Sequence, residues 1–100
     1  MNFTRIWLEF EEWGEPIDPK DANSDVAVEL EDKTVWGATF FTYANLLNLA
    51  QKNRRTGECL GGRFFWAAGM FFVDELTRER VTEVVKCLLA TGEFDQVFKQ

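Results

Sequence analysis

The chain has 100 residues, of which 46% are hydrophobic and 28% are charged, including 10 Phe and 4 Trp. This length supports one hydrophobic core, and so much apolar side chain excludes a chain kept unfolded by charge repulsion. The formal net charge of −6 disfavours nucleic acid as a partner, because phosphates are bound by Lys and Arg. We therefore expect a single folded domain over residues 1–100.

The first 41 residues predict three strands and an acidic loop. At the two-residue period of a strand, the segment Phe3 to Phe10 has one face of Thr4, Ile6, Leu8 and Phe10 and another of Phe3, Arg5, Trp7 and Glu9. Residues 11–25 contain both prolines and six acids, so we expect a loop there. Alternation resumes at Val26, and a β-prone run covers Thr34 to Phe41. These two runs predict a β-hairpin.

Two amphipathic helices are predicted further along. Thr42 can cap a helix whose apolar residues recur at three- and four-residue spacing, and Gly57 follows its basic end. Thr77 can cap a second helix with a clean apolar stripe that ends before Gly92. The tail from Glu93 to Lys99 can add a helical turn that folds back on the core.

Between the two helices lies an aromatic run, Arg63 to Val73, which predicts either one bent strand or two short strands. A buried strand is favoured for at least Met70 to Val73, and we expect the five aromatic residues to pack in the core. These residues are Phe64, Phe65, Trp66, Phe71 and Phe72. The predicted fold class is α+β, with a three- to four-stranded, mainly antiparallel sheet and two helices packed on one face.

The sequence lacks the usual groups of an enzyme site. It contains no His, which is the commonest general base and transition-metal ligand. Cys59 and Cys87 have no metal-binding spacing and are expected to be buried, reduced thiols. The acids of Asp18 to Asp25 lack the spacing of a calcium loop, and the glycines from Gly57 to Gly62 follow a helix rather than precede one. We therefore expect no enzymatic activity, no catalytic residue, no metal and no cofactor.

The longest apolar stretch, Phe64 to Met70, is much shorter than the roughly 18 residues of a membrane span. The residues after Met1 also lack the layout of a signal peptide, because acids follow within a few positions. We expect a cytoplasmic protein without a membrane partner.

Negative charge is concentrated in the first third of the chain. Residues 1–32 hold ten acids and two bases, a net charge of −8, whereas residues 33–100 have a net charge of +2. Acids interleaved with Trp can steer a basic partner and then anchor it. The predicted partner-binding residues are Glu11, Glu12, Glu15, Asp18, Asp21, Asp25, Glu29, Glu31 and Trp13. The alternative is a solvated acidic surface that protects a sheet edge.

Three segments carry a resemblance to a known class of proteins. They are Trp36 to Leu47 (WGATFFTYANLL), Thr56 to Trp66 (TGECLGGRFFW) and Gly92 to Phe98 (GEFDQVF). In size, pattern and order the chain resembles, over roughly residues 34–98, small acidic immunity proteins of bacterial toxin systems, particularly those of contact-dependent growth inhibition.

The resemblance implies a cytoplasmic antidote that binds the C-terminal domain of a delivered toxin, often a nuclease, and occludes its active site. It assigns no role to any single residue. The alternative hypothesis is an adaptor or self-associating interaction module whose exposed aromatic residues form the contact, and a monomer or weak homodimer is expected. The third alternative is an enzyme that uses paired carboxylates or a cofactor.

Overall fold

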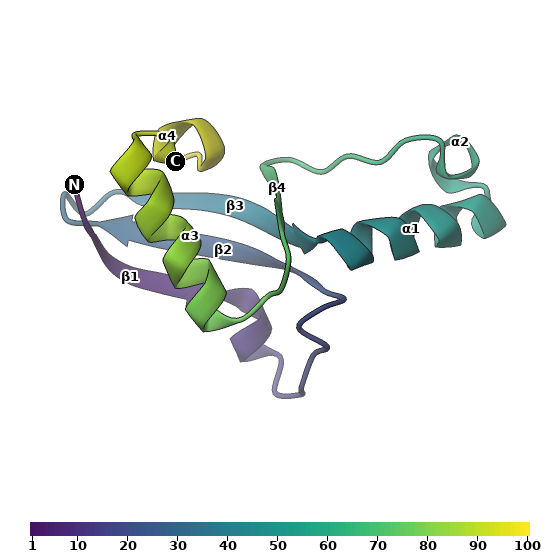
Figure 1. Ribbon diagram of the computed structural model, residues 1–100, viewed down its shortest axis with the longest axis horizontal. Coiled ribbons are helices and arrows are strands. Elements are labelled where there is room, and N and C mark those ends of the chain that lie inside the picture. Colours follow the sequence, from purple (N-terminus) through teal and green to yellow (C-terminus); the bar gives the residue numbers. More distant parts are fainter.

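The computed structural model describes all 100 residues and shows a four-stranded sheet, helices over one of its faces, and a projecting helical segment (Figure 1). In chain order the elements are β1 (Phe3–Leu8), the 3-10 helix η1 (Glu9–Glu12), β2 (Asn23–Leu30), β3 (Val35–Thr42), α1 (Tyr43–Thr56), α2 (Glu58–Gly62), β4 (Met70–Val73), α3 (Arg78–Thr91) and α4 (Phe94–Val97).

The strands follow one another in the order β1-β2-β3-β4. The pairs β1–β2 and β2–β3 are antiparallel, as short connections allow, whereas β4 returns after a long connection and lies parallel to β3. The α+β class, the predicted hairpin and the strand at Met70–Val73 are thereby confirmed.

The core lies between the sheet and α3. Alternation along the strands directs Leu8, Val28 and Phe40 toward this helix, and all three are almost fully buried. From α3, the predicted apolar stripe contributes Val81 and Val85, which are also fully buried. The predicted fold-back of the tail is confirmed, since Phe94 and Phe98 are buried and stack with ring centroids 4.6 Å apart.

The caps predicted for the two long helices are confirmed. The Thr42 hydroxyl accepts a hydrogen bond from the Asn45 amide at 3.2 Å, and the Thr77 hydroxyl accepts one from the Arg80 amide at 3.1 Å. Each helix ends at a left-handed glycine, where a side chain would cost conformational energy.

The first strand is shorter than predicted. It ends at Leu8 rather than Phe10, and η1 follows at once. The cause is local hydrogen bonding, because the Phe10 amide donates to the Ser24 hydroxyl at 3.1 Å and the Asp25 amide donates to the Glu9 carboxylate at 3.2 Å. These bonds replace strand pairing and turn the chain away. The loop predicted for residues 11–25 also ends earlier, since β2 begins at Asn23.

The position of α1 differs from the prediction that both long helices pack on one face. α1 begins directly after β3 and runs beyond the end of the sheet, while α3 and the short α4 cover the sheet face (Figure 1). Only Asn53 of α1 is buried. With no loop between β3 and α1, the chain has no place to reverse onto the sheet.

We call residues 43–69 the arm: α1, the turn α2 and the segment that returns to β4. α2 is a left-handed turn in which Cys59 and Leu60 adopt φ of 53° and 52°. The arm accounts for a radius of gyration of 14.6 Å, above the roughly 13 Å of a compact domain of this length. None of the helices is both long and apolar enough to span a membrane.

Two expectations about burial are wrong. Phe64 and Trp66 are 49% and 70% exposed, because the return segment lies outside the sheet and only Phe65 turns inward, onto Phe41 with ring centroids 5.5 Å apart. The cysteines are unpaired, as predicted, but Cys87 is exposed and Cys59 is half-buried. Cys87 lies off the buried stripe of α3 and therefore faces outward.

Candidate functional site

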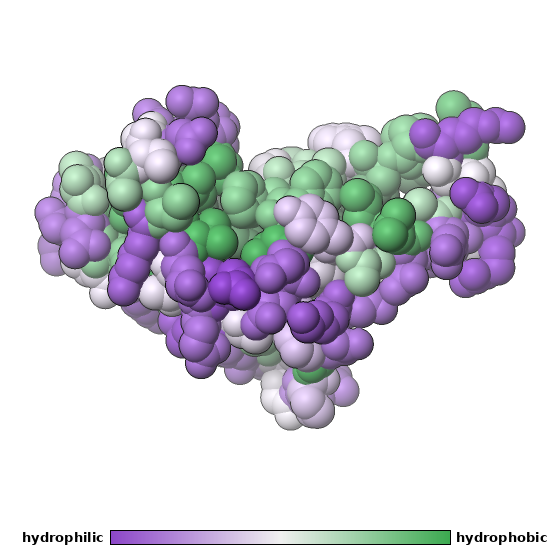
Figure 2. Space-filling view, in the orientation of Figure 1, coloured by the Kyte–Doolittle hydropathy of each residue, from purple (hydrophilic) through white to green (hydrophobic).

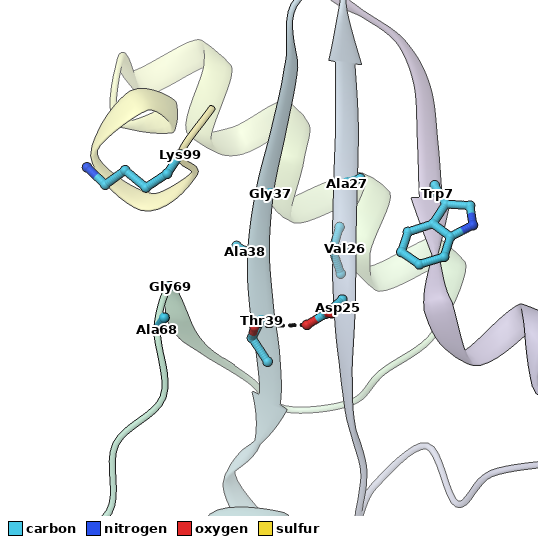
Figure 3. A pocket seen from close by; sticks show the side chains of 10 residues that line it. All are labelled: Trp7, Asp25, Val26, Ala27, Gly37, Ala38, Thr39, Ala68, Gly69 and Lys99. Carbon is cyan, nitrogen blue, oxygen red and sulfur yellow. Dashed lines mark hydrogen bonds between the residues drawn. The ribbon is translucent and has the colours of Figure 1, made fainter.

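The sheet face turned away from α3 carries no helix over β1, β2 and the first half of β3 (Figures 1 and 3). We call this surface the open face. Alternation places there the side chains that the core does not use, namely Trp7, Asp25, Ala27, Glu29 and Thr39, together with Gly37. An antiparallel sheet can leave one face in water, so the open face needs no covering element to be stable.

A hollow of about 430 Å³ lies on the open face (Figure 3). Strand register explains it, because Trp7 pairs with Ala27 and Ala27 pairs with Gly37 in one row across three strands. Two small residues in adjacent strands leave a depression, and the Trp7 ring stands at its side. Ala68 and Gly69 line the opposite side.

Hydrogen bonds hold the rim of the hollow. The Thr39 hydroxyl donates to the Asp25 carboxylate at 3.0 Å, and this bond is visible in Figure 3. The Trp7 indole N–H donates to the Glu12 carboxylate at 3.1 Å, which fixes the ring and brings an acid of η1 to the edge of the open face. The rim therefore combines an oriented indole with carboxylates.

The C-terminal tail forms the side of the hollow next to β3. Gly37 and Lys99 exchange two backbone hydrogen bonds, of 2.7 and 3.0 Å, and Lys99 lines the hollow with its ammonium group pointed away from β3 (Figure 3). A Cβ added to Gly37 would meet only the Val26 carbonyl oxygen, at 3.8 Å. The backbone around Gly37 thus has room for a larger side chain, and the hollow exists because the residue at this position has none.

A second hollow of about 100 Å³ adjoins the first on the other side of Trp7, lined also by Arg5, Ala27, Glu29 and Val35. The Glu29 carboxylate accepts a hydrogen bond from the Thr4 hydroxyl at 2.9 Å. Trp7 stands between two depressions, each rimmed by a β2 carboxylate. A tryptophan ring beside free space can contact side chains of another protein, and Trp is enriched among the residues that contribute most to binding.

The predicted partner-binding residues fall into separate groups. Asp25, Glu29 and Glu12 gather around Trp7 on or beside the open face. Glu15 and Glu11 line a different hollow, of about 470 Å³, in the acidic loop, a name we use for residues 9–22. Their surface is not continuous with Glu31, which follows β2 at its other end.

The other predicted residues of the acidic loop have different surroundings. Trp13 is 44% exposed at the end of η1. Asp18 accepts a hydrogen bond from the Lys20 amide within the loop. The Asp21 carboxylate accepts hydrogen bonds from the side-chain amides of Asn45 and Asn48, at 3.0 and 2.7 Å, and so ties the loop to α1.

Glu11 uses its charge within the molecule. Its carboxylate forms a two-pronged ion pair with the Arg78 guanidinium, at 2.6 and 2.9 Å, and Arg78 also donates to the Ile6 carbonyl oxygen at 3.1 Å. The hydrogen bond from Arg78 lowers the pKa of Glu11, and the same bond raises the pKa of Arg78. Glu11 therefore ties the acidic loop to the first residue of α3.

The other nine acids of residues 1–32 form no ion pair with any base of the chain. Their charge is available to an external base.

Trp7, Ala27, Gly37 and Thr39 were not among the predicted binding residues. Trp7 was visible as one of the tryptophans interleaved with the acids, but its role depends on the register that sets Ala27 and Gly37 beside it. No group of three or more His, Cys, Asp or Glu side chains is arranged to hold a metal ion. The groups around the hollow can stack, accept hydrogen bonds and attract a cation.

Comparison with known proteins adds no relative: no family model matches the chain, and neither a curated protein nor a solved structure matches it.

Proposed function

We propose that this protein is an immunity protein, which binds a cognate bacterial toxin domain and neutralises it by occluding its active site. One observation carries the proposal: an uncovered sheet face with a preformed hollow, an oriented Trp7 and a rim of carboxylates that have no basic partner within the chain. The sequence resemblance to immunity proteins of contact-dependent growth inhibition supports the choice of a toxin as the partner.

The charges of this surface suit a basic partner. Unpaired acids attract a positively charged domain over distances up to the Debye length, about 8 Å at physiological ionic strength, and this attraction raises the association rate. Nucleases carry Lys and Arg around their active sites because they bind phosphates. An acidic surface that docks there covers the substrate site, and its carboxylates take the place of the negatively charged phosphates.

The hollow provides a site for close contact with the partner, which charge attraction alone does not provide. Side chains of the partner can enter beside the Trp7 ring, where Ala27 and Gly37 leave room. Tryptophan is enriched among the few interface residues that contribute most binding energy. Its hydrogen bond to Glu12 holds the ring in one orientation before binding, which reduces the entropy lost on association.

Co-purification with the toxin domain encoded immediately upstream, followed by rescue of toxin-expressing cells, tests the proposal. Reversing the charge of Glu12, Asp25 and Glu29 together, the three acids around Trp7, should slow association at least tenfold and flatten its salt dependence. Glu11 is left unchanged, because its loss would release the loop from Arg78. Reversal of Glu83, Glu93 and Asp95 together, three exposed acids on or beside α3 and α4, changes the net charge by the same amount and should leave binding as in the wild type.

Failure to bind the neighbouring gene product would overturn the toxin assignment. Equal loss in the charge-matched control would show that net charge, and not the open face, determines binding.

A further inference from the structure

The arm carries most of the apolar surface that the fold leaves uncovered. Five of the eight exposed large hydrophobic residues lie within residues 43–69: Tyr43, Leu47, Leu60, Phe64 and Trp66. Figure 2 shows apolar surface between α3 and the arm, over β4, above a lower half that is mostly hydrophilic. Exposed apolar residues that gather in one region mark an interaction surface.

Beyond the hydrogen bonds from Asn45 and Asn48 to Asp21, the arm has little support from its own chain. α1 has 14 residues, and a helix of about that length is marginal in water without tertiary packing. Asn53 is the only buried residue of α1. The left-handed turn α2 then holds Leu60, 67% exposed, at the far end of the arm.

The charge of the arm indicates which kind of partner binds it. The arm holds four bases and one acid, a net charge of +3, so it accounts for the excess positive charge outside the first third of the chain. Lys52 pairs with Glu58 at 3.5 Å, but Arg54, Arg55 and Arg63 form no ion pair. The acidic loop of the same molecule holds six acids and one base, and of those acids only Glu11 is ion-paired.

We propose that the arm docks against the acidic loop of a second copy of this chain. Each copy has one arm with unpaired bases and one loop with unpaired acids, so two copies can exchange arms reciprocally and close a dimer with twofold symmetry. The apolar residues of the arm are covered in this dimer, and the loop hollow of about 470 Å³ beside Glu15 and Ile17 receives an apolar side chain of the arm. The dimer forms without any toxin, so the proposal does not rest on the proposed function.

Sedimentation of the purified chain at increasing concentration tests the proposal. We expect a reversible monomer–dimer equilibrium in the micromolar range that weakens at least tenfold between 50 mM and 500 mM NaCl. A chain that stays monomeric at several hundred micromolar would overturn the proposal, and so would open-ended growth into polymers, because reciprocal exchange closes at two copies.

A charge exchange provides the sharper test. Arg54→Glu with Arg55→Glu should prevent dimerisation, and Glu15→Lys with Asp18→Lys should do the same. The chain that carries all four substitutions should dimerise again, because the carboxylates introduced at positions 54 and 55 can pair with the ammonium groups introduced at positions 15 and 18. Lys86→Glu, an exposed base on α3, is the matched control and should leave the dimer intact.

If the fourfold variant stays monomeric while circular dichroism shows a native fold, the arm and the loop are not partners. Trp66→Ser tests the apolar part of the contact and should weaken dimerisation at least tenfold at every salt concentration. Toxin binding by the Arg54→Glu, Arg55→Glu variant is measured separately, so that failure of the dimer and failure of the toxin assignment are distinguished.

Discussion

Replacing Arg78 with Ala should destabilise the fold by about 1–2 kcal/mol, because three hydrogen bonds from one guanidinium are lost. Arg78 and Glu11 are both roughly half exposed, so their ion pair contributes only about 0.5–1 kcal/mol. The bond from the charged Arg78 side chain to the Ile6 carbonyl adds about 1 kcal/mol. For a domain of this size the loss corresponds to a melting temperature lower by roughly 5–15 °C.

A double-mutant cycle separates the two parts of this contribution. Glu11→Gln should cost less than Arg78→Ala, because the bond to Ile6 remains, and the coupling energy between the two substitutions should be about 0.5–1 kcal/mol. Arg78→Lys keeps the charge but loses the planar fork, so an intermediate stability is expected. Urea denaturation followed by tryptophan fluorescence measures the three single variants and the Glu11→Gln, Arg78→Ala double variant, with Glu15→Gln as the control carboxylate in the same loop.

The contribution of Glu11 also depends on pH, with a defined sign. Its folded-state pKa is lowered by the hydrogen bond from Arg78, so the charged form is stabilised by folding. This stability is fully present above the unfolded-state pKa and is lost as the pH falls through the folded-state pKa. The difference between wild type and Glu11→Gln should therefore narrow below about pH 4. A difference in stability between wild type and Glu11→Gln that does not change with pH would refute the stabilising role of the Arg78–Glu11 ion pair. Absence of a coupling energy in the double-mutant cycle would refute it too.

Three further predictions concern the fold. Phe98→Ala should cost about 3–5 kcal/mol in denaturant titrations, because the ring is fully buried and stacks on Phe94; a cost under 1 kcal/mol would show that the tail is not part of the core. Thr77→Ala should cost about 1 kcal/mol through loss of the α3 cap, with Thr77→Ser restoring it. In the native protein Cys87 should react with Ellman's reagent before the half-buried Cys59, and the reverse order would contradict the orientation of α3.

Local signals predicted much of the fold. The caps at Thr42 and Thr77, the alternation along β2 and the β-prone run of β3 are properties of short segments, and the structure contains each of these elements. A cap residue satisfies amides only a few positions ahead, so its effect can be read without knowledge of distant partners. The apolar stripe of α3 is equally local and is buried as predicted.

The misplaced elements depend on distant contacts. α1 has the composition of an amphipathic helix, but its direction is set by its direct junction with β3. The aromatic run was assigned to the core because Phe and Trp favour burial, yet the return segment of the arm carries Phe64 and Trp66 into solvent. Apolar residues can serve a core or an interface, and the sequence pattern does not separate these two uses.

The candidate site shows the same division. The concentration of acids in residues 1–32 was evident from the sequence, but the use of Glu11 depends on Arg78, which lies 67 positions away. The hollow depends on Trp7, Ala27 and Gly37 meeting in one row, and only strand register brings them together. A one-residue shift of register would turn these side chains to the other face.

Filling the hollow tests most directly the claim that the open face is the binding surface. Gly37→Val places a β-branched side chain where a Cβ meets only ordinary contact, and strands favour such residues, so stability should be unchanged or slightly higher. Titration calorimetry with the cognate toxin domain should show affinity reduced at least tenfold, whereas Ala90→Val on the exposed side of α3 should bind normally. Undiminished affinity of a folded Gly37→Val variant would contradict the account.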